Sequence, residues 1–379
     1  MICPPTLNII EPKQNGTIVL FFLYILVKKV KVCYNKYGDV MQDKINQSLF
    51  IIIPLLVTAL LVMVLVESLK VKEYSENIYY MDTYIYVKVY AGNKLQATEV
   101  LNGVEKIYKE YHELTNKYKE YRGLKNLYYI TYNTSKEETI TIDKRLYQLL
   151  EYGKEIYDLT NGLVDISMGN VLDIWKSYRD SEYGVPTLEE LQAVKTDSID
   201  DIVLLEKNKI LNNHVNIDLG AIAKGYVTEL AAKYLEKEGI TRYIINAGGN
   251  VVVGGNEEDK KYSIGIEDPE DPTGIFKIIY GNNISVVTSG GYNRYYEWGG
   301  KRYSHIINPN TLFPDNYMKS VTVVCSSSKF ADVLSTMLFM MDIDKGRTFV
   351  NSLEGVEAIW YTLDNQIVIS DGLLKYENK

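Results

Sequence analysis

Cysteine is scarce in this sequence of 379 residues, which holds only Cys3, Cys33 and Cys325. No two of them stand in a CxxC arrangement, which argues against a cysteine-based zinc site or a redox motif. Since Cys325 is the one cysteine after residue 33, the part of the chain that follows cannot form an internal disulfide. The scarcity fits an intracellular protein and an exported bacterial protein equally well.

An excess of basic charge is missing as well. The chain has 41 Lys and Arg against 49 Asp and Glu, for a net charge of −8, so we expect no nucleic-acid partner. The sequence also lacks GxGxxG, the Walker A motif, HExxH and Gly-x-Ser-x-Gly. The sequence therefore does not support assignment to the ordinary dinucleotide-binding proteins, NTPases, metalloproteases or esterases.

One long apolar run stands near the N-terminus. Residues 49–66 contain no charged side chain over 18 positions, the lower limit for a membrane-spanning helix. Lysines are frequent before the run, and acidic and basic residues are mixed after it, which predicts a cytoplasmic N-terminus and an exported remainder. No small-x-small cleavage site follows Val66, so we expect an uncleaved signal anchor; the alternative is a buried core helix.

The chain is therefore predicted to have three parts. Residues 1–48 form a cytoplasmic segment, residues 49–66 a transmembrane signal anchor, and residues 73–379 a folded domain. Met41 begins a stretch that looks like an ordinary export signal, so we expect Met41 to be the start and residues 1–40 to be an extension.

Hydrophobic periodicity in the remainder predicts an α+β domain with mixed sheets and packed helices. Helices are expected at residues 95–118, 146–159, 222–238 and 330–341, the second with Asp143 as its N-cap. Strands are expected at residues 79–90, 243–246, 251–253, 284–288, 302–307 and 320–325.

Two of these helices carry polar groups in apolar surroundings. Asp332 and Thr336 are one turn apart on a largely apolar helix, and their oxygens are of the kind that Mg²⁺ prefers. The alternative is an Asp in the first turn that caps its own helix, with a Thr bonded to a backbone carbonyl. Asp218 and Lys224 flank a helix start, where backbone N–H groups attract a diphosphate. The alternative there is a capping Asp and a solvated Lys.

Two further segments have the residue types of ligand-facing loops. Thr160–Trp175 combines a helix end at Gly162 with Asp165 and Gly169. His305, one of three histidines, is predicted at a strand end before Asn308-Pro309, a place where catalytic groups are often found. A lone His is more often structural, and the pattern leaves both readings open.

Taken together, seven segments in order resemble the ApbE-type flavin transferases, the FAD:protein FMN transferase family. They are Met81-Asp82-Thr83, Thr160–Trp175, Asp218–Gly225, Asn246–Asn250, Thr288-Ser289-Gly290, His305–Pro309 and Ala331–Thr336. The resemblance covers roughly residues 75–375 and implies a single compact, T-fold-like catalytic domain behind the anchor.

The resemblance also implies roles for individual residues. His305 matches the family's base for the acceptor hydroxyl. The Mg²⁺ ligands would be Asp332, Thr336 and the main-chain carbonyl of Ala221. The expected FAD contacts are Met81, Tyr118, Leu163, Val164, Asp165, Asp218 and Lys224.

By the same resemblance, the chain is expected to split FAD and to attach FMN through a phosphoester to a Thr or Ser of a client flavoprotein, with release of AMP. The expected client is a subunit of a membrane redox complex, and the expected location is the bacterial cell membrane, single-pass, with the catalytic domain on the extracytoplasmic side. Hydrolysis of FAD to FMN and AMP and non-enzymatic FAD binding stay as alternatives. One departure from the family pattern lies beside the expected base, because Leu312 stands where Gly is usual.

Overall fold

The structure is a computed structural model that describes residues 52–53, 55–60, 63, 70–292 and 294–378. The chain divides into two compact units, residues 1–70 and 71–379. The described residues of the predicted anchor (52–53, 55–60 and 63) are helical, and the rest of the anchor and segment 1–48 lie outside the described residues. Among the residues that are described, no helix combines the length and the apolar character needed to cross a membrane.

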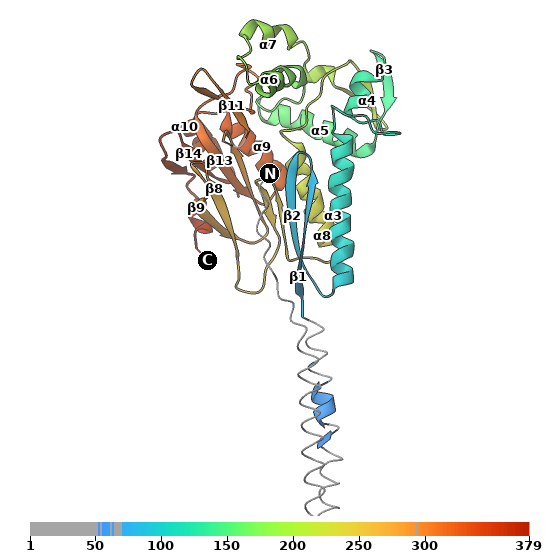
Figure 1. The fold of residues 1–379 in the computed structure, drawn as a ribbon, viewed down its shortest axis with the longest axis vertical. Coiled ribbons are helices and arrows are strands. Elements are labelled where there is room, and N and C mark those ends of the chain that lie inside the picture. Colours follow the sequence, from blue (N-terminus) through green and yellow to red (C-terminus); the bar gives the residue numbers. More distant parts are fainter. Residues whose placement is uncertain (1–51, 54, 61–62, 64–69, 293, 379) are drawn as a thin grey trace, which may run out of the picture. The chain divides into compact units, whose positions relative to one another are not determined.

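An antiparallel sheet of eight strands forms the centre of the second unit (Figure 1), and its strand order is β1-β2-β6-β7-β10-β13-β14-β15. The strands are β1 (Lys72–Tyr80), β2 (Thr83–Ala91), β6 (Tyr243–Ala247), β7 (Asn250–Val253), β10 (Ile284–Gly290), β13 (Met318–Cys325), β14 (Glu357–Thr362) and β15 (Ile367–Ile369). Successive side chains of a strand point to opposite faces, so this sheet can contribute to two cores.

Both faces of the sheet are covered. Helices α3 (Lys94–Leu114), α8 (Ala223–Lys237) and α9 (Ser328–Phe339) pack on one face, and the hairpin of β8 (Tyr262–Asp268) and β9 (Asp271–Gly281) contributes to a second core. The alternation is clear in β14, where Ala358 and Trp360 join the core of the helices while Ile359 joins that of the hairpin.

Shorter elements complete the unit beyond one end of the sheet (Figure 1). They comprise α4 (Leu127–Tyr132), α5 (Lys144–Leu159), α6 (Gly169–Ser181), α7 (Leu188–Val194), a three-stranded sheet of β3 (Glu138–Thr141), β5 (Lys209–Asn212) and β4 (Val203–Leu205), and the hairpin of β11 (Tyr295–Trp298) and β12 (Lys301–Ser304). Helix α10 (Ile343–Asn351) and the 3₁₀ turns η1 (Ile199–Asp201) and η2 (Leu373–Tyr376) account for the remaining described elements.

The α+β prediction is confirmed, and the predicted N-cap of α5 is present, since Asp143 accepts a hydrogen bond from the backbone of Arg145 at 2.8 Å. Three boundaries were wrong. The expected strand 79–90 is a hairpin that turns at Met81 and Asp82, with φ angles of 54° and 55°. Such a turn usually signals itself through Asn or Gly, and neither is present.

The other two elements, a helix and a strand, end earlier in the structure than the sequence predicts. The expected helix 95–118 ends at Leu114, because Asn116 accepts hydrogen bonds from the backbone of Tyr118 (2.9 Å) and Lys119 (2.8 Å) and so forms a local turn. The expected strand 302–307 ends at Ser304, whose partner Tyr295 is the first residue of β11. His305 therefore lies just beyond the hairpin.

Candidate functional site

All the predicted site residues line one cleft of about 1060 Å³. They are Met81, Tyr118, Leu163, Val164, Asp165, Asp218, Ala221, Lys224, His305, Asp332 and Thr336. The other segments that carry the family resemblance reach the same cleft through Asn246, Gly248, Gly249 and Thr288–Gly290. Segments that are up to about 250 residues apart in sequence are thus brought to one place, although their individual roles stay predictions.

The imidazole of His305 is held by the backbone of Arg294, the residue before β11. Its Nδ1 lies 3.1 Å from the carbonyl oxygen of Arg294, which also accepts the backbone N–H of His305 at 3.0 Å. A carbonyl only accepts, so Nδ1 carries the proton and Nε2 has a free lone pair. Desolvation by the walls of the cleft, together with the positive charge of Arg294, lowers the pKa of His305. The ring is thus kept neutral, as a base requires.

The carboxylate of Asp332 is buried where α8 and α9 meet. It is 5% exposed, and one of its oxygens accepts the backbone N–H of Gly225 at 2.7 Å. Position 225 must be Gly for this approach, because a β-carbon there would lie 2.4 Å from the β-carbon of Asp332. Burial raises the pKa of Asp332, and the charge of Lys224 and the Gly225 N–H offset that rise only in part.

This hydrogen bond has a consequence for Ala221. In a regular helix the N–H of Gly225 would bond to the carbonyl of Ala221, four residues earlier. Here it bonds to Asp332 instead, and no hydrogen bond within the described part of the chain reaches the Ala221 carbonyl. Thr336 donates to the Asp332 carbonyl at 3.1 Å and keeps the lone pairs of its hydroxyl. A carboxylate, a hydroxyl and a free carbonyl are therefore available at one place.

The two alternative interpretations of these helices are settled in part. Asp332 does not cap its own helix, since Ser327 does so by accepting the N–H of Phe330 at 3.3 Å. The Thr336 hydroxyl does bond to a backbone carbonyl, as the alternative expected. Asp218 does not cap α8 either: its Oδ1 accepts the N–H of Gly220 at 2.9 Å, and the N-cap position is Ile222.

The turn at Met81 is fixed to two other segments of the site. The N–H of Met81 donates to Nδ1 of His112 at 3.1 Å, and the guanidinium of Arg294 donates to the carbonyl of Asp82 at 2.7 Å. Arg294 therefore contacts both the Met81 turn and, through its own carbonyl, His305. Non-glycine residues rarely adopt positive φ angles, and such strain is often retained at functional sites.

Asp165 lies in the loop before α6, and both of its carboxylate oxygens have partners within the protein. Its Oδ1 accepts the N–H (2.8 Å) and the hydroxyl (2.6 Å) of Ser167, and its Oδ2 lies 3.6 Å from the ammonium of Lys195. The side chain is 6% exposed. Both carboxylate oxygens of Asp165 are thus committed to partners within the protein.

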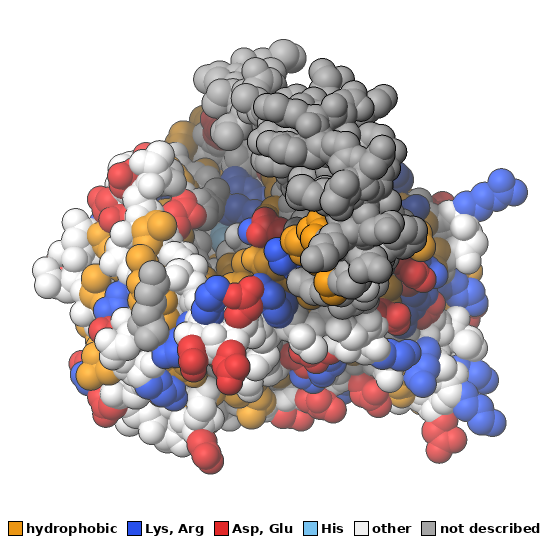
Figure 2. Space-filling model, turned by 90° about the horizontal axis from the view of Figure 1, so that it is seen from below, with side chains coloured by type: hydrophobic (Ala, Val, Ile, Leu, Met, Phe, Trp, Pro, Cys, Tyr) orange, Lys and Arg blue, Asp and Glu red, His pale blue; other side chains and the backbone are white. Residues whose placement is uncertain are grey.

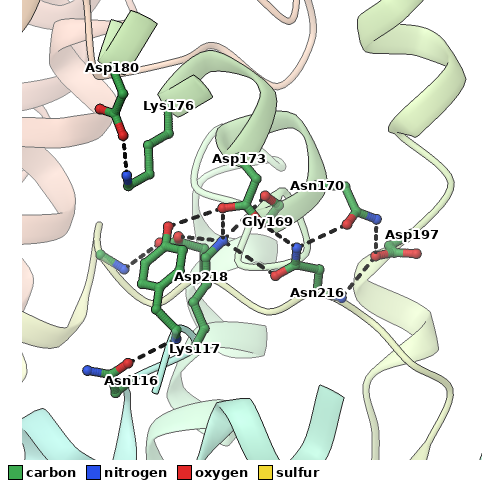
Figure 3. Close-up of polar contacts among 12 residues, drawn as sticks. Asn116, Lys117, Gly169, Asn170, Asp173, Lys176, Asp180, Asp197, Asn216 and Asp218 are labelled. Atoms are coloured by element: carbon green, nitrogen blue, oxygen red, sulfur yellow. Dashed lines mark hydrogen bonds and ion pairs between the residues drawn. The ribbon is translucent and has the colours of Figure 1, made fainter. Parts of the chain in front are cut away.

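Sequence reasoning missed Lys117, which lies in the link after α3. Its ammonium is 2.9 Å from Asp173 and 3.2 Å from Asp218, and it also contacts Asn216 (Figure 3). An isolated Lys between Asn116 and Tyr118 looks like a surface residue, so the pattern contained no signal for it. A further miss is Arg294, whose role depends on its backbone carbonyl as much as on its charge.

Leu312, the departure beside the base, adopts a left-handed conformation with φ of 65°. Its side chain is 5% exposed and packs with Trp175, whose indole N–H donates to the Leu312 carbonyl at 2.8 Å. Burial of a Leu side chain contributes about 2 kcal/mol, which is comparable with the roughly 1–2 kcal/mol that a left-handed residue costs. The loop therefore keeps the backbone shape that Gly would allow.

On the face seen in Figure 2, acidic and basic side chains of the described residues are interspersed. This distribution agrees with the net charge of −8.

Comparisons with known proteins agree with this geometry. The FAD:protein FMN transferase of Klebsiella pneumoniae (strain 342) is 27% identical over 305 residues, which are 78% of this chain and 92% of that protein. The FAD:protein FMN transferase of Haemophilus influenzae is 32% identical over 225 residues, or 56% of this chain and 65% of that protein.

Solved structures give the same result. The crystal structure of the ApbE protein from Thermotoga maritima superposes with a TM-score of 0.72 at 26% identity, over 81% of this chain and 100% of that one. The flavin transferase ApbE from Vibrio cholerae, at 23% identity and a TM-score of 0.66, shares the fold over 81% of this chain and 99% of its own. Residues 81–360 match the model of the ApbE family. Because this match spans well over half of the sequence, the chain belongs to the ApbE family.

Proposed function

We propose that this chain is an FAD:protein FMN transferase that attaches FMN to a Thr or Ser hydroxyl of a client flavoprotein. One observation carries the proposal. A neutral His305 with a free Nε2 lines the same cleft as Lys224 and the oxygens of Asp332, Thr336 and Ala221. The names of the relatives support the same activity.

The proposed reaction forms one P–O bond and breaks another. The hydroxyl oxygen of the client attacks the phosphorus on the FMN side of the FAD diphosphate, and its proton passes to Nε2 of His305. The bond between that phosphorus and the bridging oxygen breaks, and AMP leaves with the bridging oxygen. The lowered pKa of His305 suits this role, because the imidazole is unprotonated before the attack.

Lys224 is the residue we assign to the diphosphate. It lies in the first turn of α8, where the helix dipole favours an anion. In the described part of the chain, no carboxylate lies within 4.0 Å of its ammonium, and its positive charge acts on both Asp332 and His305. Lys224 is thus free to pair with a phosphate between those two residues.

The residues fit a Mg²⁺ ion. Asp332, Thr336 and the Ala221 carbonyl would hold it, since Mg²⁺ prefers hard oxygen ligands. The ion would also supply the positive partner that the buried Asp332 carboxylate needs. When bound, Mg²⁺ would offset the negative charge that develops on the diphosphate. The chain's own contribution is to present these oxygens through the close approach of α8 and α9.

The location and the client are part of the proposal and depend on the sequence. The apolar run 49–66 and the lysines before it support a single-pass anchor in a bacterial cell membrane, with the catalytic domain outside. A client subunit of a membrane redox complex would fit that position. A chain started at Met41 should sediment with membranes and one started at Glu73 should not; a soluble product from Met41 would contradict the anchor.

The activity can be tested with residues 71–379, which form one compact unit. This protein is incubated with FAD, Mg²⁺ and a client flavoprotein subunit with an acceptor Thr. We expect the mass of the client to increase by one esterified FMN, with one AMP released per client. Free FMN and AMP with an unmodified client would indicate the hydrolytic alternative, and intact FAD bound to the protein would indicate a carrier.

A further inference from the structure

Lys117 is almost completely buried, with 6% of its side chain exposed. Burial of a charged ammonium is costly unless the charge is paired and hydrogen-bonded. Four acceptors surround it: a carboxylate oxygen of Asp173 at 2.9 Å, one of Asp218 at 3.2 Å, the carbonyl of Gly169 at 3.3 Å and Oδ1 of Asn216 at 3.4 Å. An ammonium has three protons, so Lys117 is fully satisfied here.

These partners come from separate segments of the chain. Asp173 lies on α6, Asp218 lies in the loop before α8, and Lys117 itself follows α3 (Figure 3). The ammonium therefore joins three segments at a wall of the cleft. Two of them contain residues that the sequence predicts to contact FAD, namely Tyr118 and Asp218.

Asp173 connects Lys117 to Tyr118, because it contacts both side chains. Its Oδ1 accepts the phenol of Tyr118 at 3.1 Å as well as the Lys117 ammonium, and its Oδ2 accepts Nδ2 of Asn216 at 2.7 Å. Asn216 is in turn fixed by Asn170 (3.0 Å) and Asp197 (3.0 Å). The ring of Tyr118, 58% exposed, is thus held at its hydroxyl while it stays open to a ligand.

The two carboxylates depend on this single cation. Asp173 and Asp218 both lie within 3.2 Å of the same nitrogen, so they would repel each other without it. The two cations of α6 itself, Lys176 and Arg179, both pair with Asp180. Among the described residues, only Lys117 forms an ion pair with either carboxylate.

We propose that Lys117 is a positioning residue for FAD binding. It orients the Asp218 carboxylate to accept hydrogen bonds from the amino or hydroxyl groups of the nucleotide half, and through Asp173 it orients the Tyr118 ring. The inference rests on the proposed function for the identity of the substrate. Lys117 acts through these two residues and does not take part in the chemistry.

The test compares Lys117→Met, which keeps the length of the side chain and removes the charge, with Lys125→Met, an exposed Lys of the same link. Both are made in the full chain, kept in detergent. The Kd for FAD is measured by flavin fluorescence, and KM and kcat are measured for transfer. We expect Lys117→Met to raise Kd and KM by about tenfold to a hundredfold, the value of one or two charge-assisted hydrogen bonds. Its kcat should stay within a few-fold, and Lys125→Met should match the wild type.

A double variant distinguishes positioning from general stability. Asp218→Asn is measured alone and together with Lys117→Met. If Lys117 acts through Asp218, the double variant should bind FAD little worse than Asp218→Asn alone. The double variant also removes one cation and one anion together, so it keeps the test open if Lys117→Met alone does not fold. Lys117→Arg, which keeps the charge, should recover part of the affinity.

Several results would overturn the inference. They are an unchanged Kd in Lys117→Met, a fall in kcat at unchanged KM, or effects of the two substitutions that simply add. A wild type that binds FAD without transfer would contradict the proposed function alone, because the Kd comparison would still test Lys117. A wild type that does not bind FAD would contradict both.

Discussion

Two buried charges lie in the walls of the cleft, and their surroundings differ. Lys117 has two carboxylates and two neutral acceptors around its ammonium. Asp332 has the backbone N–H of Gly225 at 2.7 Å, and no described Lys, Arg or His nitrogen lies within 4.0 Å of its carboxylate. The cation is thus compensated by neighbouring carboxylates, whereas the anion is compensated only in part, by the Gly225 N–H and the charge of Lys224.

The difference separates two uses of a buried charge. A compensated charge holds its neighbours in place, because any movement would break several ion pairs and hydrogen bonds at once. A carboxylate that is compensated only in part and has a raised pKa is costly for the folded protein, and such groups are frequent at functional sites. The Asp332 region is therefore where we expect ligands to supply the missing charge.

The largest effect should follow from removal of that carboxylate. We expect Asp332→Ala to lower FMN transfer by about a thousandfold or more, since several kcal/mol of charge stabilisation would be lost. The fold should persist, because the substitution removes a buried charge that the protein compensates only in part. The rate of client flavinylation is measured with and without a chelator, and Asp344→Ala, on the exposed surface of α10, is the control. Full turnover in excess chelator would contradict the assignment of a metal to this region.

His305→Ala should have the next largest effect. The transfer rate should fall by about 10²–10⁴, the usual range for one general base. The Kd for FAD should change by no more than a few-fold, because we assign the diphosphate to Lys224. His214→Ala, outside the cleft, is the matched control. If the variant lost FAD and kept its turnover at saturation, His305 would be a binding residue.

Lys224→Met sharpens the comparison of the two lysines. Lys224 is not paired within the described structure, whereas Lys117 is paired, so Lys224 should contact the substrate directly. We expect the Kd for FAD to rise by about tenfold to a hundredfold, with a fall in kcat as well, because diphosphate charge builds up in the reaction. Lys237→Met, in the exposed last turn of the same helix, should have no effect. A change in Kd with an unchanged kcat would assign Lys224 to ground-state binding only.

The smallest expected effect is a shift in pH dependence. Arg294, Lys224 and Arg179 all disfavour the imidazolium form of His305, in addition to desolvation. A lowered pKa keeps the base unprotonated to lower pH, so removal of one cation should raise the pKa and move the acid-side loss of activity to higher pH. We expect Arg294→Met to shift it by about one pH unit or less. Arg294→Lys, which keeps the charge, should shift it less, and an unchanged pH profile in both would contradict the electrostatic role.

Local sequence patterns were sufficient for the helices that carry the site. The boundaries of α5, α8 and α9 follow from apolar spacing and from caps such as Asp143, all of which act within a few residues. The pairing of Asp332 and Thr336 on one face follows from helix geometry alone. Local patterns were less informative where long-range contacts decide the conformation. The Met81 turn is held by His112 and Arg294, which lie 31 and 212 residues from their partners in sequence.

The sequence by itself determined the α+β class, the family resemblance and a set of predicted site residues that line the cleft, because these depend on residue type, order and short spacing. Only the tertiary structure decided what each group is free to do. In the folded protein, Lys117 is buried between two carboxylates, and Asp165 contacts Ser167 and Lys195. The Ala221 carbonyl is free because the N–H of Gly225, its expected partner, bonds to Asp332 instead. The physical reason is that a polar group becomes available or committed through its partners in space, and these partners lie on segments far apart in the chain.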